Sequence, residues 1–325
     1  MLTIRGIASC LVLSALVLAL SPDEISRMSQ CPPQEPAITF VAVGDVLLAR
    51  GIERRITRYG RSWPFEKVTE TLRSADLAFC NLECPLSAGG IKVNKPICFK
   101  ADPANVQCLA DAGFDVISLA NNHGLDCGRL GLIETMHYLE KMGIAYAGAG
   151  NTLAESALPT IVDVRGVKIA FLAQNALYPE GVWFRPDAAN IAPLDPETIE
   201  AEVADAARRA DVVVVSLHWG VEYRRQPQPE QVEMARKLID AGADLILGHH
   251  PHVTQPVERY HGGVIAYSLG NFLFDSPFAK CKESMILKCR LSKSGVSDLE
   301  LIPVRIEYFR PGLPKYAGIL YNSAG

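Results

Sequence analysis

Seven short clusters of polar residues carry the chemistry of this 325-residue sequence, and each follows an apolar run that predicts a buried strand. They are Gly44-Asp45, Asn81-Leu82-Glu83, Asn121-Asn122-His123, His218-Trp219-Gly220, Glu222, Gly248-His249-His250-Pro251-His252 and Leu269-Gly270-Asn271. Carboxylate and amide oxygens together with neutral imidazoles suit Mn, Zn or Fe. A carboxylate that bridges two such ions holds them ~4 Å apart, where they activate a water and clamp a phosphate ester. The clusters therefore predict a site for two divalent metal ions.

The elements that must position these clusters alternate between strands and helices. Proline after aspartate predicts a helix start, and glycine predicts a helix end. The predicted strands are residues 38–43, 115–119, 211–217 and 243–247, and the predicted helices begin at Asp102-Pro103, Asp195-Pro196 and Glu230. An alternating segment at residues 160–172 turns at Arg165-Gly166 and predicts a hairpin. We expect a mixed α/β fold with the polar clusters at the carboxyl ends of its strands, where α/β sheets bind ligands.

Composition indicates one large soluble domain. The chain is 49% hydrophobic and 21% charged, and its formal net charge is −4 with a pI near 6.0. A basic footprint for nucleic acid is not visible in these values. An anionic substrate would have to bind through the metals or through a local basic patch.

The N-terminus predicts export from the cytoplasm. Arg5 precedes an apolar run at residues 7–20, which has the length of a signal peptide. Ala19-Leu20-Ser21 resembles a cleavage site, but Pro22 is a poor residue after it. We therefore interpret residues 1–21 as a signal peptide or an uncleaved membrane anchor and residues 22–37 as a linker. Either alternative predicts an extracytoplasmic protein.

Cysteine usage leaves two alternatives open. Removal of Cys10 with the signal segment would leave eight of the nine cysteines, an even number. Cys84 could pair with Cys98, and Cys281 with Cys289, in an oxidising compartment. The other interpretation is that these cysteines are buried free thiols.

Taken together and in this order, the motifs resemble those of the CapA-type proteins of bacterial poly-γ-glutamate capsule synthesis, a branch of the calcineurin-like metallophosphoesterase superfamily. The resemblance extends from about residue 38 to residue 274. It implies a metallophosphoesterase-like β-sandwich flanked by helices, with two sheets that meet at the metal site. The corresponding domain spans residues 38–275, and residues 276–325 are expected to add strands that complete it.

The resemblance also implies a role for each motif residue. His123 would protonate the leaving group, while Glu83 would bridge the two ions. His250 is the less expected ligand, because the family pattern is Gly-His-x-Pro-His. The implied metal ligands are Asp45, Glu83, Asn122, His218, His249 and His252.

Three further positions need separate comment: one differs from the wider phosphoesterase pattern, and two have alternative interpretations. Leu47 stands where that pattern has a histidine, so one metal has one imidazole fewer. Glu222 is either a catalytic residue beside the His218 motif or a solvated loop charge. Asn271 is expected to shape a turn or to hold a ligand loop.

Two classes of function agree with these features. The first is a metal-dependent hydrolase acting on a phosphoester or on the polymer itself. The second is a non-catalytic subunit that binds or exports the nascent anionic polymer together with membrane-bound capsule-synthesis subunits. Metal content separates the two classes.

Overall fold

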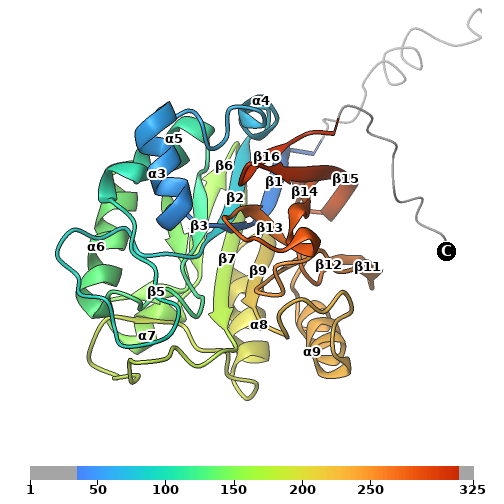
Figure 1. The fold of residues 1–325 in the computed structure, drawn as a ribbon. Coiled ribbons are helices and arrows are strands. Elements are labelled where there is room, and N and C mark those ends of the chain that lie inside the picture. Colours follow the sequence, from blue (N-terminus) through green and yellow to red (C-terminus); the bar gives the residue numbers. More distant parts are fainter. Residues whose placement is uncertain (1–34, 315–325) are drawn as a thin grey trace, which may run out of the picture. The chain divides into compact units, whose positions relative to one another are not determined.

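The computed structural model describes residues 35–314, in which two mixed β-sheets pack face to face between helices (Figure 1). The larger sheet has the strand order β16-β15-β14-β1-β2-β3-β4, and β13 also pairs with β1. Its strands are β1 (Ala37–Val46), β2 (Leu77–Leu82), β3 (Val116–Ser118), β4 (Ala145–Ala147), β13 (Asn271–Leu273), β14 (Glu283–Ser292), β15 (Gly295–Glu307) and β16 (Arg310–Gly312). The C-terminal strands β14 to β16 thus extend the same sheet as β1.

The second sheet has the order β11-β12-β10-β9-β7-β6. Its strands are β6 (Thr160–Val164), β7 (Val167–Asn175), β9 (Val212–His218), β10 (Leu245–His249), β11 (Val257–Tyr260) and β12 (Gly263–Ala266). A separate small ribbon pairs β5 (Ala149–Gly150) with β8 (Asn190–Ile191). The helices are α3 (Arg50–Tyr59), α4 (Thr69–Arg73), α5 (Val106–Ala112), α6 (Gly128–Lys141), α7 (Leu153–Ser156), α8 (Ile199–Arg209) and α9 (Pro229–Asp240), with 3₁₀ turns η1 (Pro103–Asn105) and η2 (Ala279–Lys282).

Side chains that alternate along each strand divide the protein into layers. On β1, Phe40 and Ala42 face the second sheet, whereas Val41 and Val43 pack with the helices α3 to α6. Between the sheets the rings of Phe79 and Phe171 stack with centroids 5.8 Å apart. The outer face of the second sheet packs on α8 and α9. The result is a sandwich of two sheets flanked by helices, as the sequence motifs imply (Figure 1).

Parallel pairing brings the carboxyl ends of the central strands to one edge. In the larger sheet β1, β2 and β3 run parallel, and in the second sheet β7, β9 and β10 do the same. Asp45 pairs in register with Asn81, and His218 with His249. The polar clusters of the two sheets therefore come from equivalent strand ends.

The local predictions are mostly confirmed. The hairpin of β6 and β7 turns at Arg165 and Gly166, both with positive φ (54° and 81°), as a tight hairpin turn requires. Asp102 accepts a hydrogen bond from the amide of Ala104 and caps η1, which leads into α5. The predicted start at Asp195-Pro196 was wrong by three residues. Asp195 caps a turn there, and α8 begins only at Ile199.

All seven described cysteines are free thiols. The Sγ of Cys84 accepts from the amide of Leu48, whereas the Sγ of Cys98 donates to the carbonyl of Asp126. Cys289 faces the core between the sheets. The free-thiol interpretation therefore holds for both of the pairs considered.

The predicted signal or anchor segment, residues 1–21, lies outside the described residues, as does most of the predicted linker. Within residues 35–314, none of the helices combines the length and the apolar character needed to span a membrane.

Gly44 provides a test of how the segments pack at the edge that carries the polar clusters. A Cβ atom at this position would lie 1.8 Å from the carbonyl oxygen of Gly270, which accepts the amide hydrogen of Asp45. Gly44→Ala must push these two segments apart, and overpacking of this kind costs about 1–3 kcal/mol. We expect urea unfolding to show a loss of that size.

Gly89→Ala is the matched control. The atom nearest to a Cβ at Gly89 is the flexible carboxylate of Glu134, at 3.1 Å, which can move aside. If both variants unfold at the same urea concentration as the parent, the close approach at Gly44 is wrong.

Candidate metal centre

Side chains from both sheets converge at the shared carboxyl edge. Asp45 ends β1, Glu83 follows β2, and Asn122 with His123 follows β3. His218 ends β9 and His249 ends β10, while His250 and His252 lie in the loop after β10. Only Asn122 among these is more than marginally exposed. The structure thus brings together all the side chains that the motifs nominate as metal ligands.

Glu83 lies at the centre of this group. Its Oε1 atom is 3.9 Å from the Nε2 atoms of His123, His218 and His252. The side chain is fully buried, and neither carboxylate oxygen has a hydrogen-bond partner. Burial raises the pKa of Glu83 well above its usual range. A buried carboxylate without partners is costly, so this position calls for a cation.

Asp45 is the second buried carboxylate. Its Oδ1 accepts a hydrogen bond from Asn81 at 2.8 Å and lies 3.4 Å from Nδ1 of His249. Its Oδ2 is 3.3 Å from Nδ1 of His252. Burial alone would raise the pKa of Asp45, but the interactions with the two histidines outweigh it, so this pKa is well below its usual range. Asp45 therefore stays ionised, as a metal ligand must.

His218 and Asn122 contact each other within the group. His218 Nε2 is 3.0 Å from Asn122 Oδ1, and its Nδ1 is 3.4 Å from Asn81 Nδ2. Burial lowers the pKa of His218 well below its usual range. The imidazole is neutral as a result, which is the form that binds metals.

His123 is oriented from behind by a buried ion pair. Its Nδ1 lies 2.8 Å from Oδ2 of Asp126, and the other carboxylate oxygen, Oδ1, contacts the ammonium of Lys95. Its ring stacks on Phe99 with centroids 4.1 Å apart. Burial lowers the pKa of His123, while the carboxylate of Asp126 opposes this shift. The Nε2 atom of His123 is thereby directed at Glu83.

The loop after β10 is held in an uncommon backbone conformation. His250 and His252 have φ values of 94° and 57°, which cost about 1–3 kcal/mol each for residues other than glycine. Nδ1 of His252 lies 2.8 Å from Oδ1 of Asn271, so Asn271 holds this loop. Burial lowers the pKa of His252, but Glu83 and Asp45 raise it to about 10 overall.

His250 lies in the same loop, and Glu222 lies in the connection between β9 and α9. The ring of His250 lies 5.0 Å from that of His218 and 5.8 Å from that of His252. Glu222 is exposed, and its carboxylate lies with His250 and His252 in a group whose ligand atoms are within 4.8 Å of one another. The structure therefore places Glu222 at the mouth of the centre.

The donor set fits divalent metal ions. Asp45, Glu83 and His252 offer ligand atoms within 4.8 Å of one another. Both ring nitrogens of His249 and Nδ1 of His250 are buried without a hydrogen-bond partner, as are the oxygens of Glu83. Metal bonds to imidazole and carboxylate are ~2.0–2.2 Å long, so atoms 3.9 Å apart leave room for an ion between them. Buried ligand atoms without hydrogen-bond partners are typical of a metal site.

Fold and donor set together define the class: two packed sheets with carboxylate, amide and imidazole groups at one edge are the calcineurin-like metallophosphoesterase fold. The model of the family "Bacterial capsule synthesis protein PGA_cap" matches residues 39–276, and the chain belongs to this family. It is 31% identical to the capsule biosynthesis protein CapA of Bacillus anthracis over 94% of this chain and 77% of the relative. It is 34% identical to the PGA biosynthesis protein CapA of Bacillus subtilis over 83% of this chain and 72% of the relative.

A solved structure supports the fold. The NAD nucleotidase of Haemophilus influenzae superposes with a TM-score of 0.51 and 12% sequence identity, covering 86% of this chain and 61% of that protein. At this identity the likeness concerns the fold alone.

Three residues that support the centre were not assigned a role from the sequence: Asn81, Asp126 and Lys95. Asn81 lies in the second cluster and bridges Asp45 and His218, and Asp126 lies three residues after the third cluster, which ends at His123. Both could have been found from that proximity. Lys95 gives no such signal, because it reaches Asp126 from a loop that the motifs do not include.

Glu83→Gln tests the metal centre without a measurement of activity. Ligand at a hundredfold its dissociation constant stabilises a protein by about 2.7 kcal/mol. We expect Mn²⁺ to raise the unfolding free energy of the metal-stripped parent by an amount of this order and to have much less effect on Glu83→Gln. Because the Glu83 oxygens have no hydrogen bond to lose, the metal-free variant should be at least as stable as the metal-free parent.

Glu134→Gln serves as the control, since Glu134 lies on α6 and contacts Ser87 and Gly89 instead of the centre. It should keep the full response to Mn²⁺. A parent that Mn²⁺, Zn²⁺ and Fe²⁺ all fail to stabilise would contradict the metal site.

Proposed function

We propose that this protein is a metal-dependent hydrolase of the capsule synthesis family, acting on a phosphoester or a related bond. The observation that carries the proposal is Glu83, a fully buried carboxylate without hydrogen bonds that faces imidazoles from both sheets. A purely structural role does not explain such a group, since burying it costs stability. Catalytic centres accept that cost because they use the charge.

Asp45, Glu83, Asn122, His218, His249 and His252 are the residues that would hold the two ions, with Glu83 at the centre of the group. Two bound ions of Mn, Zn or Fe would supply Lewis acids and lower the pKa of a water at the centre. Asp45 and Glu83 would keep these ions bound by charge, and Asn81 would fix the orientation of Asp45 and His218.

His123 is the residue that we propose to protonate the leaving group. Its Nε2 atom faces the centre, and Asp126 on its Nδ1 atom fixes the ring and favours the protonated form. The same contact keeps the proton at Nε2 aimed at the place where a leaving oxygen would develop negative charge. Lys95 in turn holds Asp126 and so acts as a positioning residue.

Glu222 is proposed to contact the substrate at the mouth of the centre. It is exposed, whereas His250 and His252 beside it are buried. A carboxylate there can accept a hydrogen bond from a substrate hydroxyl or amide. It would also repel a second anionic group, which favours one direction of entry.

The family and the N-terminus support a proposal for the substrate and the location. We propose an anionic polymer or phosphoester as substrate and membrane-bound capsule-synthesis subunits as partners, in line with the capsule biosynthesis role named for the relatives from Bacillus. The apolar run at residues 7–20 supports a location outside the cytoplasmic membrane.

One observation favours the alternative of a non-catalytic polymer-binding or export subunit. Leu47 replaces the imidazole of the wider superfamily pattern and is packed in the core, with no exposed surface. One ion then has fewer protein ligands. Fewer than one bound metal per chain would support this alternative over the hydrolase.

Paired histidine variants test the proposed catalysis. His123→Asn should lower turnover of a small phosphodiester such as bis(p-nitrophenyl) phosphate by about 10²–10⁴-fold, the usual contribution of general acid catalysis. Its metal content should equal that of the parent, because His123 is not a ligand in the proposed site. His137→Asn, on an exposed position of α6, is the control and should leave both quantities unchanged. Equal loss of metal and turnover in His123→Asn would make His123 a ligand instead.

Cell fractionation tests the proposed location. Because Pro22 weakens the cleavage site, we expect a substantial membrane-bound fraction that detergent releases and whose N-terminus retains residues 7–20. Sequencing of the mature N-terminus supplies the measurement. A protein that begins at Met1 and is extracted from the cytoplasm without detergent would overturn the proposed location.

A further inference from the structure

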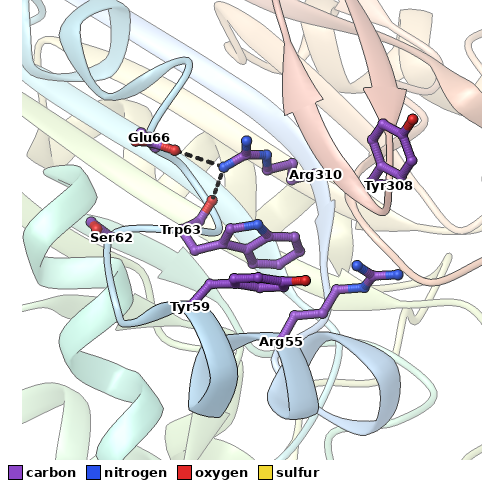
Figure 2. Close-up of a pocket in the computed structure, with 7 residues that line it drawn as sticks. All are labelled: Arg55, Tyr59, Ser62, Trp63, Glu66, Tyr308 and Arg310. Atoms are coloured by element: carbon purple, nitrogen blue, oxygen red, sulfur yellow. Dashed lines mark hydrogen bonds and ion pairs between the residues drawn. The ribbon is translucent and has the colours of Figure 1, made fainter.

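A cleft lined by arginine and aromatic side chains lies between α3 and the end of β15, away from the ligands described above. It encloses about 440 Å³ and is lined by Arg55, Tyr59, Trp63, Glu66, Tyr308 and Arg310. Figure 2 shows Trp63 between Tyr59 and Arg310, with Arg55 and Tyr308 at the open side. The Tyr59 and Trp63 rings stack with centroids 6.0 Å apart, and the Arg310 guanidinium lies 5.3 Å from the Trp63 ring. We call this feature the arginine–aromatic cleft.

The cleft continues into a second hollow of about 450 Å³, which shares Arg55 and Tyr308 with it. Phe274 lines this second hollow, and its ring lies 5.0 Å from the ring of His252. A single aromatic ring thus separates the continuation of the cleft from the candidate metal centre.

Positive charge is in excess along this path. Glu66 pairs with Arg310 at 2.7 Å, and Glu307 is 4.0 Å from Lys67. The cations that remain in the two hollows are Arg55, Lys282 and Arg305. None of these three makes an ion pair with any residue in the described range 35–314. The excess stands out in a chain whose formal net charge is −4.

The guanidinium of Arg55 is held in an orientation that suits binding of an anion. Its guanidinium lies 4.8 Å from the Phe309 ring and 5.8 Å from the Trp63 ring, so aromatic faces orient it. A guanidinium held in this way loses little side-chain freedom when it binds a carboxylate through two hydrogen bonds. The exposed ring of Tyr308 beside it offers an apolar surface to methylene groups.

We propose that the arginine–aromatic cleft and its continuation past Phe274 bind a stretch of a linear polycarboxylate, as a site separate from the metal centre. Carboxylates of the polymer pair with Arg55, Lys282 and Arg305, while the methylene segments between them pack on Tyr308 and Trp63. The next segment of the same chain then lies against Phe274, whose ring separates it from His252. The choice of ligand rests on the proposed function, whereas the existence of the site rests on the charges and rings described above.

Binding in the presence of a chelator tests the cleft independently of the metals. The probe is fluorescently labelled poly-γ-glutamate, and the measurement is its anisotropy with EDTA present at low ionic strength. We expect the parent to bind the polymer and salt to weaken this binding. Arg55→Gln and Tyr308→Ala should each weaken it about three- to tenfold, since the pairs are partly exposed to water. Tyr308 is 79% exposed, so its variant keeps the fold even if Arg55→Gln does not.

Arg236→Gln is the matched control, because Arg236 also lies over a ring, that of Tyr260 at 5.2 Å, but on α9 outside the cleft. It changes the net charge equally and should bind polymer as the parent does. Metal-loaded Arg236→Gln should hydrolyse bis(p-nitrophenyl) phosphate at the parent's rate. That assay reports on the proposed hydrolase, so its failure is distinct from a failure of the cleft.

Three results would overturn the proposal. The first is an EDTA-treated parent that does not bind the polymer. The second is equal binding by the parent, Arg55→Gln and Tyr308→Ala. The third is equally tight binding of polyphosphate of matched length, which would replace the carboxylate assignment with general attraction of polyanions.

Discussion

Two fully buried carboxylates, Asp45 and Glu83, constrain most of what surrounds them in this protein. They come from neighbouring parallel strands of one sheet, and most of the imidazoles that face them come from the other. Because an unpaired buried charge costs several kcal/mol, the two sheets can close over this edge only if positive or metal-binding groups meet it there. Three features bring such groups to the two carboxylates: the strained loop of His250 and His252, the close approach at Gly44, and the side chain of Asn81 between Asp45 and His218.

The sandwich was implied by the family resemblance, whereas the residue patterns alone were sufficient to predict a mixed α/β fold and the set of converging residues, for a physical reason. Side chains at the ends of parallel strands share one edge of a sheet, so an apolar run followed by Asp45, Glu83 or His218 already carries positional information. Alternation along β1 likewise separates Phe40 from Val41 into different cores. These inferences need only local periodicity and the geometry of strands.

What the sequence could not predict depends on distant contacts. Lys95 reaches Asp126 across a loop, and no periodicity announces that contact. His250 was set aside as a ligand because of its place in the motif, yet the positive φ of its backbone turns its ring toward His218. The helix start near Asp195 was misplaced for a local reason instead, since a capped turn and a capped helix share the same residues. The arginine–aromatic cleft joins α3 to β15 and β16, segments that lie about 250 residues apart.

The exchange of residues at the centre has its own physical logic. Leu47 fills the core where the superfamily pattern has an imidazole. The superfamily pattern usually has an aspartate at the position of Glu83. The glutamate is one methylene longer, and its carboxylate lies 3.9 Å from each of three histidines. The longer glutamate side chain can extend further into the centre than an aspartate and can thereby compensate for the missing imidazole. Glu222 adds an exposed carboxylate beside His250 and His252. The anionic polymer proposed as substrate would be repelled there except where metal ions or cations offset these groups, so the basic path that ends at Phe274 would be its electrostatically favoured approach.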